Sequence, residues 1–252
     1  MGWRSARTGS DLLLGAALAC AATAHAAHPL ITEDTGTQGE GRFELELGLA
    51  GTRDDASRGW EFGPQLSGGL SANVDLIARP AWLELRHSAA AGGGNPRGAG
   101  DTALDFKWRI GEQDGFSVGT RAGIALPTGD ADKGLGAGKA WFHGVVIAQA
   151  AITAWTLIAN AGYLQDPSPG ERANLWYGTA AAVWQATGQW RLTGEAAAFR
   201  SPDPSRSTWP SVARFGAIAT VAPWLDLDVG YQFRLNRAAQ RQVVLAGATL
   251  RW

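Results

Sequence analysis

The sequence contains one cysteine, one methionine and no long hydrophobic run. Its longest apolar stretch, about a dozen residues near the N-terminus, is shorter than the ~20 residues that a transmembrane helix needs, which excludes a bundle of such helices. An excess of one charge is also absent, because 22 Lys and Arg residues accompany 23 Asp and Glu residues, for a net charge of -1. We therefore expect no nucleic-acid partner, since such proteins normally carry a basic excess.

Residues 1–26 have the features of a cleaved signal peptide. Arg4 and Arg7 supply positive charge ahead of the apolar stretch, and Ala24 and Ala26 supply the small residues of a cleavage site. The single cysteine, Cys20, lies within this segment, so the mature chain is expected to have no disulfide and no thiolate metal site. The sequence thus predicts an exported protein with an N-terminal segment 27–41 followed by a β-domain 42–252.

Beyond residue 41 the sequence alternates between apolar and polar residues with a period of two, which is typical of β-strands. Leu104, Phe106 and Trp108 share one face of such a stretch, whereas Asp105 and Lys107 share the other. The alternating stretches are ~10 residues or longer, while strands of soluble proteins usually have 5–6. Short connections also alternate with longer ones rich in Gly, Pro and charge, a pattern typical of outer-membrane barrels.

The pattern predicts an all-β protein, a transmembrane antiparallel up-and-down β-barrel of about 12 strands. Because the strand number is even, both termini are expected on the periplasmic side. The strands are predicted at 42–51, 59–70, 74–86, 101–110, 115–126, 140–148, 155–164, 174–184, 190–199, 211–221, 225–235 and 241–252.

Tryptophan is abundant, with 12 residues, and those of the β-domain fall near strand ends. Aromatic rings prefer the headgroup region of a bilayer because they are partly apolar and partly polar, so we expect two aromatic girdles. Near the longer loops stand Trp60, Trp82, Trp141, Trp176 and Trp209. Near the short turns stand Trp108, Trp155, Trp184, Trp190, Trp224 and Trp252.

The polar face of each strand is expected to line a lumen, because lipid requires the apolar face outside. The acidic and basic residues of this face are nearly balanced and can pair across the lumen, so we predict a narrow or partly plugged channel. The predicted lumen-lining residues are Glu44, Glu46, Asp75, Arg79, Asp105, Lys107, Arg121, Arg191, Glu195, Arg214, Asp226, Asp228 and Arg234.

Two terminal features carry further hypotheses. The segment 27–41 is too polar for lipid and is predicted either to fold into the lumen as a plug or to remain a loose periplasmic tail. In the plug interpretation, Glu33 and Asp34 pair with luminal arginines. The terminal Trp252 ends an alternating strand and is expected to act as a recognition signal for the barrel-assembly machinery.

Three stretches resemble the outer-membrane transporter family labelled "MetA-pathway of phenol degradation". They are the segment 28–39, the run 98–101 that leads into 104–108, and the run 126–130 that leads into 134–138. The resemblance spans nearly the whole mature chain and implies an outer-membrane barrel linked to aromatic compounds. It carries over no functional residues.

The sequence thus favours passive passage of small solutes across the outer membrane of a Gram-negative bacterium, with aromatic or hydrophobic compounds as candidates. A structural or adhesive barrel without transport remains an alternative, and an outer-membrane lipid hydrolase is a weaker one. His87 and Ser88 are adjacent and point to opposite faces, so they do not form a nucleophile–base pair. We expect no enzyme activity, no catalytic, metal or cofactor site, and outer-membrane lipid as a partner. The run 127–139 lacks the glycine and hydroxyl positions of a phosphate-binding loop and is expected to be a mobile outer loop.

Overall fold

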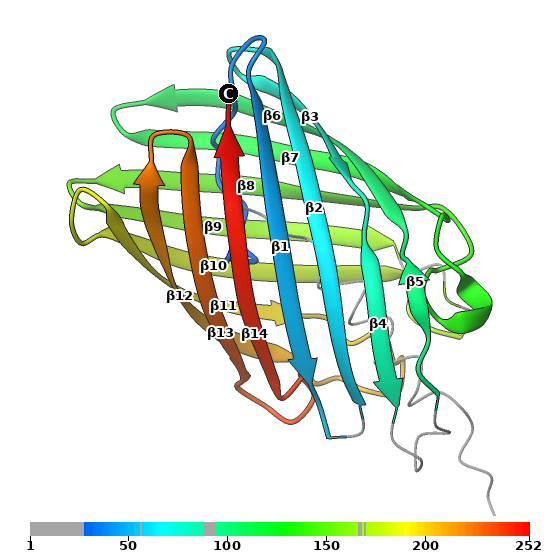
Figure 1. Cartoon of the computed structure of the whole chain (residues 1–252). Helices are drawn as coiled ribbons and strands as arrows, with labels where there is room; N and C mark the ends of the chain where they lie inside the picture. Colours follow the sequence, from blue (N-terminus) through cyan, green and yellow to red (C-terminus); the bar gives the residue numbers. More distant parts are fainter. Residues whose placement is uncertain (1–27, 56, 88–93, 166–167, 169) are drawn as a thin grey trace, which may run out of the picture.

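The computed structural model describes residues 28–55, 57–87, 94–165, 168 and 170–252, so the predicted signal peptide lies outside the described residues. The strands form one sheet that closes on itself, because β1 (Phe43–Arg53) pairs with both β2 (Ser57–Ser71) and β14 (Gln242–Arg251). Every recorded strand pair is antiparallel. The predicted antiparallel barrel is confirmed (Figure 1).

Twelve positions around the barrel are filled by fourteen strand segments. The remaining segments are β3 (Val74–Arg79), β4 (Trp82–His87), β5 (Arg97–Ala99), β6 (Thr102–Gln113), β7 (Phe116–Leu126), β8 (Trp141–Ile152), β9 (Trp155–Gln165), β10 (Asn174–Gln185), β11 (Trp190–Phe199), β12 (Ser211–Ala222) and β13 (Leu225–Arg234).

The predicted strand 74–86 is interrupted, and this break accounts for one additional segment. β3 and β4 follow β2 in one continuous register, in which Ala78 faces Leu66 and Trp82 faces Phe62. Pro80 stands between them and has no backbone N–H to donate to a neighbouring strand. The short β5 pairs with β4 on its other edge before the chain continues into β6.

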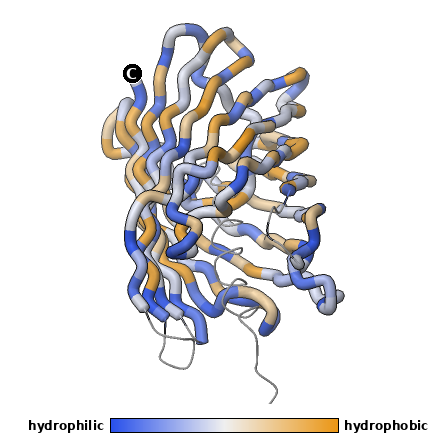
Figure 2. Tube along the Cα trace, turned by 90° about the vertical axis from the view of Figure 1, so that its right-hand side faces the viewer, coloured by the Kyte–Doolittle hydropathy of each residue, from blue (hydrophilic) through white to orange (hydrophobic). Residues whose placement is uncertain are grey.

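The barrel wall carries apolar residues on its outside and polar residues on its inside, the opposite of a soluble protein. On β6, Phe106 is 43% exposed on the outside, whereas its neighbour Asp105 is 4% exposed on the inside. Figure 2 shows hydrophobic and hydrophilic residues alternating along the strands. None of the described segments forms a helix long and apolar enough to cross a membrane. An apolar exterior over a polar interior suits a barrel surrounded by lipid.

The tryptophans near strand ends are exposed on the outside, with one exception. Trp155 and Trp184 stack at the turn end of the barrel, with ring centroids 5.8 Å apart. Trp141, which we predicted to join the loop-end girdle, is only 8% exposed. It begins β8 on the same inward face as His143, and the two rings lie 5.4 Å apart. That prediction was wrong because closeness to a strand end does not decide which face a residue occupies.

Most connections follow the predicted alternation of short turns and longer loops; the exception is the loop-end connection from β1 to β2, since β1 ends at Arg53 and β2 begins at Ser57. Asp114 and Gly115 both adopt positive φ angles, as a tight two-residue hairpin turn requires. The predicted connection 149–154 was too long, because β8 runs to Ile152 and only Thr153 and Ala154 separate it from β9. In Figure 1 the C-terminus stands at the turn end of the barrel, and the longer loops lie at the opposite end.

The long connection between β7 and β8 is a folded loop. It contains a short 3-10 helix, η2 (Ala131–Lys133), whose N-cap Asp130 accepts a hydrogen bond from the Lys133 ammonium at 2.6 Å. This contact lowers the pKa of the Asp130 carboxyl. The Asp101 carboxylate accepts hydrogen bonds from the backbone N–H groups of Gly129 and Ala137, at 3.0 and 2.8 Å. One side chain, just ahead of β6, therefore ties both ends of the loop, and the expectation that the loop is mobile stays a prediction.

Replacing Asp101 with Ala is expected to release this loop. The two backbone N–H groups lose their acceptor, which increases the open population about tenfold. Trypsin cleavage after Lys133 and Lys139 should accelerate by the same factor, as followed by electrophoresis of the folded barrel. The exposed Asp132 provides the matched control, and Asp132→Ala should leave the rate of cleavage after Lys139 unchanged. Equal cleavage rates for the two variants would show that Asp101 does not hold the loop.

Candidate functional site

The N-terminal segment 28–38 lies inside the barrel, where it contacts side chains from strands on all sides. Its backbone N–H groups donate to inward-facing oxygen atoms, so the wall holds the backbone itself. The recorded pairs are His28 with Glu46, Ile31 and Thr32 with Glu195, Glu33 with Asn160, Thr35 with Gln149, and Gln38 with Asp75. These acceptors belong to β1, β11, β9, β8 and β3.

Glu195 on β11 is the acceptor with the largest number of recorded contacts to this segment. It accepts hydrogen bonds from the N–H of Ile31 at 2.7 Å, the N–H of Thr32 at 2.9 Å and the Thr32 hydroxyl at 2.7 Å. Arg214 on β12 lies 3.4 Å from the same carboxylate and donates to the carbonyl oxygen of Pro29 at 2.8 Å. A neighbouring carboxylate and guanidinium therefore hold the first residues of the segment by their main-chain polar groups.

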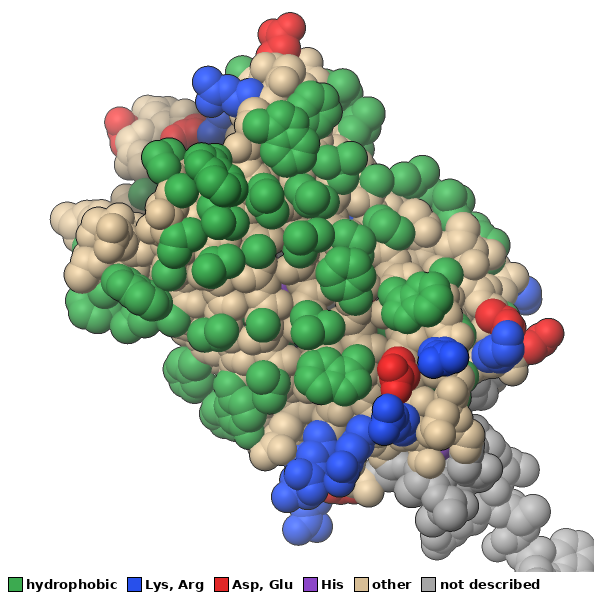
Figure 3. Space-filling view, in the orientation of Figure 1, with side chains coloured by type: hydrophobic (Ala, Val, Ile, Leu, Met, Phe, Trp, Pro, Cys, Tyr) green, Lys and Arg blue, Asp and Glu red, His purple; other side chains and the backbone are tan. Residues whose placement is uncertain are grey.

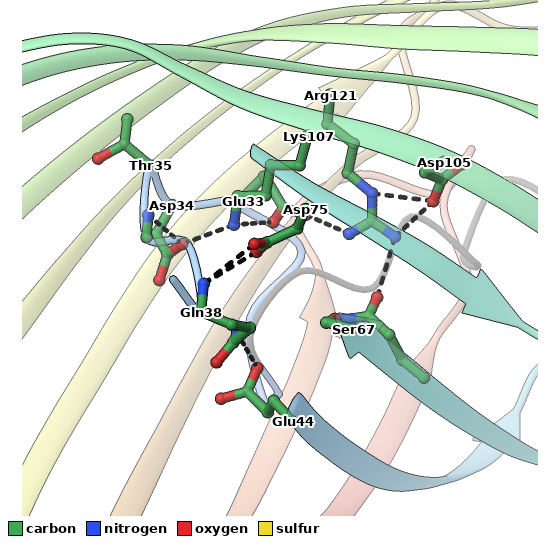
Figure 4. Close-up of polar contacts among 12 residues, drawn as sticks. Glu33, Asp34, Thr35, Gln38, Glu44, Ser67, Asp75, Asp105, Lys107 and Arg121 are labelled. Carbon is green, nitrogen blue, oxygen red and sulfur yellow. Dashed lines mark hydrogen bonds and ion pairs between the residues drawn. The ribbon is translucent and has the colours of Figure 1, made fainter. Parts of the chain in front are cut away.

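Glu33 lies at the centre of a buried charge network (Figure 4). Its carboxylate contacts the Lys107 ammonium at 2.8 Å and the Arg121 guanidinium at 2.7 Å. Asp105 lies on the far side of Arg121, and its carboxylate also contacts His143 at 2.6 Å and Arg79 at 3.0 Å. Such a network needs every partner, because a buried charge without a counter-charge is costly.

Asp34 is the more accessible acid of the segment, with a side chain 37% exposed. It contacts the same Lys107 ammonium at 2.9 Å. Burial acts to raise the pKa of the Asp34 carboxyl, but the charge and hydrogen bond of Lys107, together with the backbone N–H of Gly36, outweigh burial and leave this pKa below its ordinary value. The segment thus contributes two negative charges opposite inward-facing cations of β6 and β7.

The predicted lumen-lining residues at the two ends of the barrel form separate groups. Near the turn end, Asp226 contacts Arg191 at 2.6 Å and Arg251 at 2.8 Å, and Arg251 also contacts Glu44 at 2.7 Å. Near the loop end, Arg234 contacts Asp55 at 3.0 Å. The predicted set is therefore divided among several ion-pair groups, and Arg251 belongs to one of them although the sequence analysis did not include it.

Space for the start of the segment comes from glycines on the inner wall. His28 forms a short contact with Asp228, and its ring lies against Gly48 and Gly247. A Cβ atom added at Gly216 would lie 2.5 Å from Cγ of Pro29, and one added at Gly230 would lie 2.9 Å from its Cβ. Gly216 and Gly230 therefore leave the space that Pro29 occupies, and a larger residue at either position would displace Pro29.

Replacing Gly216 with Val is accordingly expected to push the segment from its position. The added side chain overlaps Pro29, and overpacking of this kind costs about 1–3 kcal/mol. Proteinase K, which cleaves without needing Lys or Arg, should then cut the N-terminal segment faster in the folded protein. Gly188 provides a matched control, because nothing lies within 4 Å of a Cβ atom added there. A Gly216→Val protein as resistant as the Gly188→Val protein would contradict the placement.

Aromatic side chains face inward in the half of the barrel nearer the loops. Tyr177 on β10 and Phe199 on β11 have ring centroids 5.7 Å apart, and Trp141 stands at the start of β8. None of these three residues was predicted to be luminal. The period-two alternation does place them inward, because each of the three lies on the same face of its strand as charged or buried residues.

Neutral polar residues were also missed. Asn160, Gln149 and Ser117 contact the segment, and Gln65 accepts from Arg121 at 2.9 Å. The selection of charged residues alone left them out, although the period-two alternation places them on the inner face.

Comparison with solved structures shows the same type of barrel. The COG4313 outer membrane channel from Pseudomonas putida F1 superposes with a TM-score of 0.67 at 12% identity, covering 87% of this chain and 98% of that one. The KdgM porin gives a TM-score of 0.58 at 6% identity, covering 81% of this chain and 98% of that one. The translocator domain of the autotransporter NalP from Neisseria meningitidis gives 0.51 at 12% identity, covering 96% and 98%. At these identities the likeness is one of fold.

No curated protein matches the sequence. A family model does match it over residues 26–252, which includes both the luminal segment and the entire barrel. The three stretches noted in the sequence now have structural positions, because the first is the luminal segment and the other two meet where Asp101 holds the β7–β8 loop. The chain belongs to the family described as "Putative MetA-pathway of phenol degradation".

Proposed function

We propose that the protein is an outer-membrane channel for passive diffusion of small solutes, and that its segment 28–38 acts as a plug. The observation that carries this proposal is the network in which Glu33 joins Lys107 and Arg121 inside a closed barrel. The apolar belt suits lipid, and the polar lumen suits water and solutes. The plug also supplies counter-charges, because Lys107 and Arg121 face inward and contact its acidic residues.

The proposed solutes are small aromatic or hydrophobic compounds. The family description supports this class, and so do the inward-facing rings of Trp141, Tyr177 and Phe199 in the loop-side half of the barrel. Aromatic rings favour stacked or edge-to-face contacts with one another, so a passing aromatic solute finds partners there. Arg79, beside His143 and Trp141, adds a positive group suited to a carboxylate.

The test is single-channel conductance of the refolded protein in a planar bilayer. Benzoate added on the loop side should interrupt the current in a concentration-dependent way, whereas acetate at the same concentration should not. Trp141→Ala should weaken the benzoate effect by about two- to twelvefold, because stacking contributes ~0.5–1.5 kcal/mol beyond burial. Equal effects of benzoate and acetate would rule out an aromatic preference, and an inserted barrel that stays silent even without residues 28–39 would favour a structural or adhesive role.

The proposal includes no catalytic step and no cofactor. His143 is held by Asp105 and Arg79, an arrangement that serves charge neutralisation at the lumen wall. A lipid hydrolase would release fatty acid from phospholipid vesicles. Measuring fatty-acid release by the folded barrel therefore separates the two functions, and we expect no release.

Export by a cleaved signal peptide 1–26 and recognition of Trp252 by the barrel-assembly machinery are parts of the same proposal. Trp252 is exposed at the turn end and stacks on Phe43, with ring centroids 6.1 Å apart, where β14 meets β1. Trp252→Ala should lower the amount of folded barrel in the outer membrane while the purified variant still refolds in detergent. An undiminished membrane yield would remove the role in assembly.

A further inference from the structure

Three arginines stand side by side on the outer wall at the loop end of the barrel. Arg53 of β1 lies directly opposite Arg58 of β2, and Arg58 lies directly opposite Arg86 of β4. All three side chains are exposed. Each shares its strand's outward face, since Arg58 is two residues from the exposed Trp60 and Arg86 is four residues from the exposed Trp82.

This row of positive charge is only partly neutralised. Like charges directly opposite on neighbouring strands destabilise a sheet. Arg86 contacts Glu84 at 2.7 Å, although its own side chain remains 66% exposed. Among the residues that the structure describes, Arg53 and Arg58 have no ion pair. The nearby Asp55 carboxylate is directed elsewhere, because it contacts Arg234 at 3.0 Å.

The row lies just beyond the aromatic girdle. Trp60 and Arg58 are separated by about 7 Å along β2, the rise of two strand residues. Further along the same outward face, Phe62, Leu66 and Leu70 are exposed and apolar. Figure 3 shows this face, with Lys and Arg side chains gathered along its lower edge beneath the hydrophobic band. Since tryptophan marks the headgroup boundary, the arginines stand at the level of lipid phosphates.

We propose that Arg53, Arg58 and Arg86 bind the phosphate of an outer-leaflet lipid whose acyl chain lies along β2. Guanidinium groups bind phosphate through paired hydrogen bonds, and a doubly charged phosphate would relieve the repulsion across the three strands. The apolar surface below supplies the contact for the chain. The inference rests on the proposed outer-membrane location, in which the loop end meets the outer leaflet.

The test uses the refolded full barrel in detergent micelles and lipid A that carries both of its phosphates. Native mass spectrometry during a titration gives the Kd for one bound lipid. The triple variant Arg53→Gln, Arg58→Gln, Arg86→Gln should bind at least tenfold more weakly than the parent protein. The control Arg42→Gln, Lys139→Gln, Arg206→Gln removes the same charge from other exposed positions and should bind within twofold of the parent. Lysine at the three sites should restore part of the affinity, because it retains the charge and loses the paired geometry.

Three outcomes would overturn the proposal. The first is equal loss in the control variant, which indicates a response to net charge. The second is unchanged binding of lipid A that lacks its phosphates, which indicates adsorption of the acyl chains. The third is equally tight binding of inorganic phosphate, which indicates an anion site without a lipid. Single-channel conductance of the arginine variant should match the parent, so failure of this proposal is distinguishable from failure of the channel function.

Discussion

Removal of residues 28–39 is expected to raise the single-channel conductance of the refolded barrel several-fold. The segment crosses the lumen from Asp228 on β13 to Asp75 on β3, so it occupies the path that ions would take. Without it, Lys107 and Arg121 face open space and can be hydrated. The measurement is conductance in a planar bilayer, with the parent and shortened proteins refolded in the same way.

A synthetic peptide of residues 27–39 provides the control for this deletion. Added to the shortened barrel, it should restore the low conductance, whereas a scrambled peptide of equal composition should not. The contacts that hold the segment depend on the order of its backbone and charged groups, which the scrambled peptide lacks. An unchanged conductance in a correctly folded shortened barrel would show that segment 28–38 is not the obstruction.

Replacing Glu33 with Ala is expected to have the second largest effect. Loss of one partner from a buried ion pair costs about 3–5 kcal/mol. Because Asp105 still contacts Arg121 and Asp34 still contacts Lys107, we expect the lower end of this range. A change of about 3 kcal/mol shifts the balance between docked and released segment roughly a hundredfold.

Labelling of a single introduced cysteine measures this shift directly. Leu30 is buried in the docked segment, so Leu30→Cys should react slowly with a polar maleimide. Adding Glu33→Ala should accelerate labelling by about a hundredfold if released segment is the reactive form. Asp34→Ala is the matched control, because its partly exposed pair with Lys107 contributes only ~0–1 kcal/mol. Equal acceleration by both variants would contradict the central place of Glu33.

Much of the barrel can be predicted from the sequence because lipid imposes a strict alternation on each strand. Asp105 and Phe106 differ so strongly in polarity that their faces are unambiguous, and strand ends were mostly predicted within a few residues. The break at Pro80 was missed because the flanking alternation continues through it in register. Trp141 was assigned to the outside because its position at a strand end was given more weight than its parity with His143.

The candidate site was harder to predict because its partners are distant in the sequence. Glu33 and Arg121 are 88 residues apart, and pairing across a lumen depends on which strands come to face each other. Their charges marked Glu33 and Arg121 as candidate luminal residues, but charge does not show that the two pair with each other. The acceptors for the backbone of the segment, such as Asn160 and Gln149, carry no charge and have no distinguishing sequence signal beyond their face.

The contact between His28 and Asp228 also has a consequence for the order of folding. These residues are 200 positions apart, and the segment between them forms nearly the entire wall. Contacts of such separation are the costliest in chain entropy to form early, so the segment docks after most of the wall exists. We therefore expect each newly folded molecule to pass through a wider, water-filled state, which lasts until these eleven residues find their glycine-lined position.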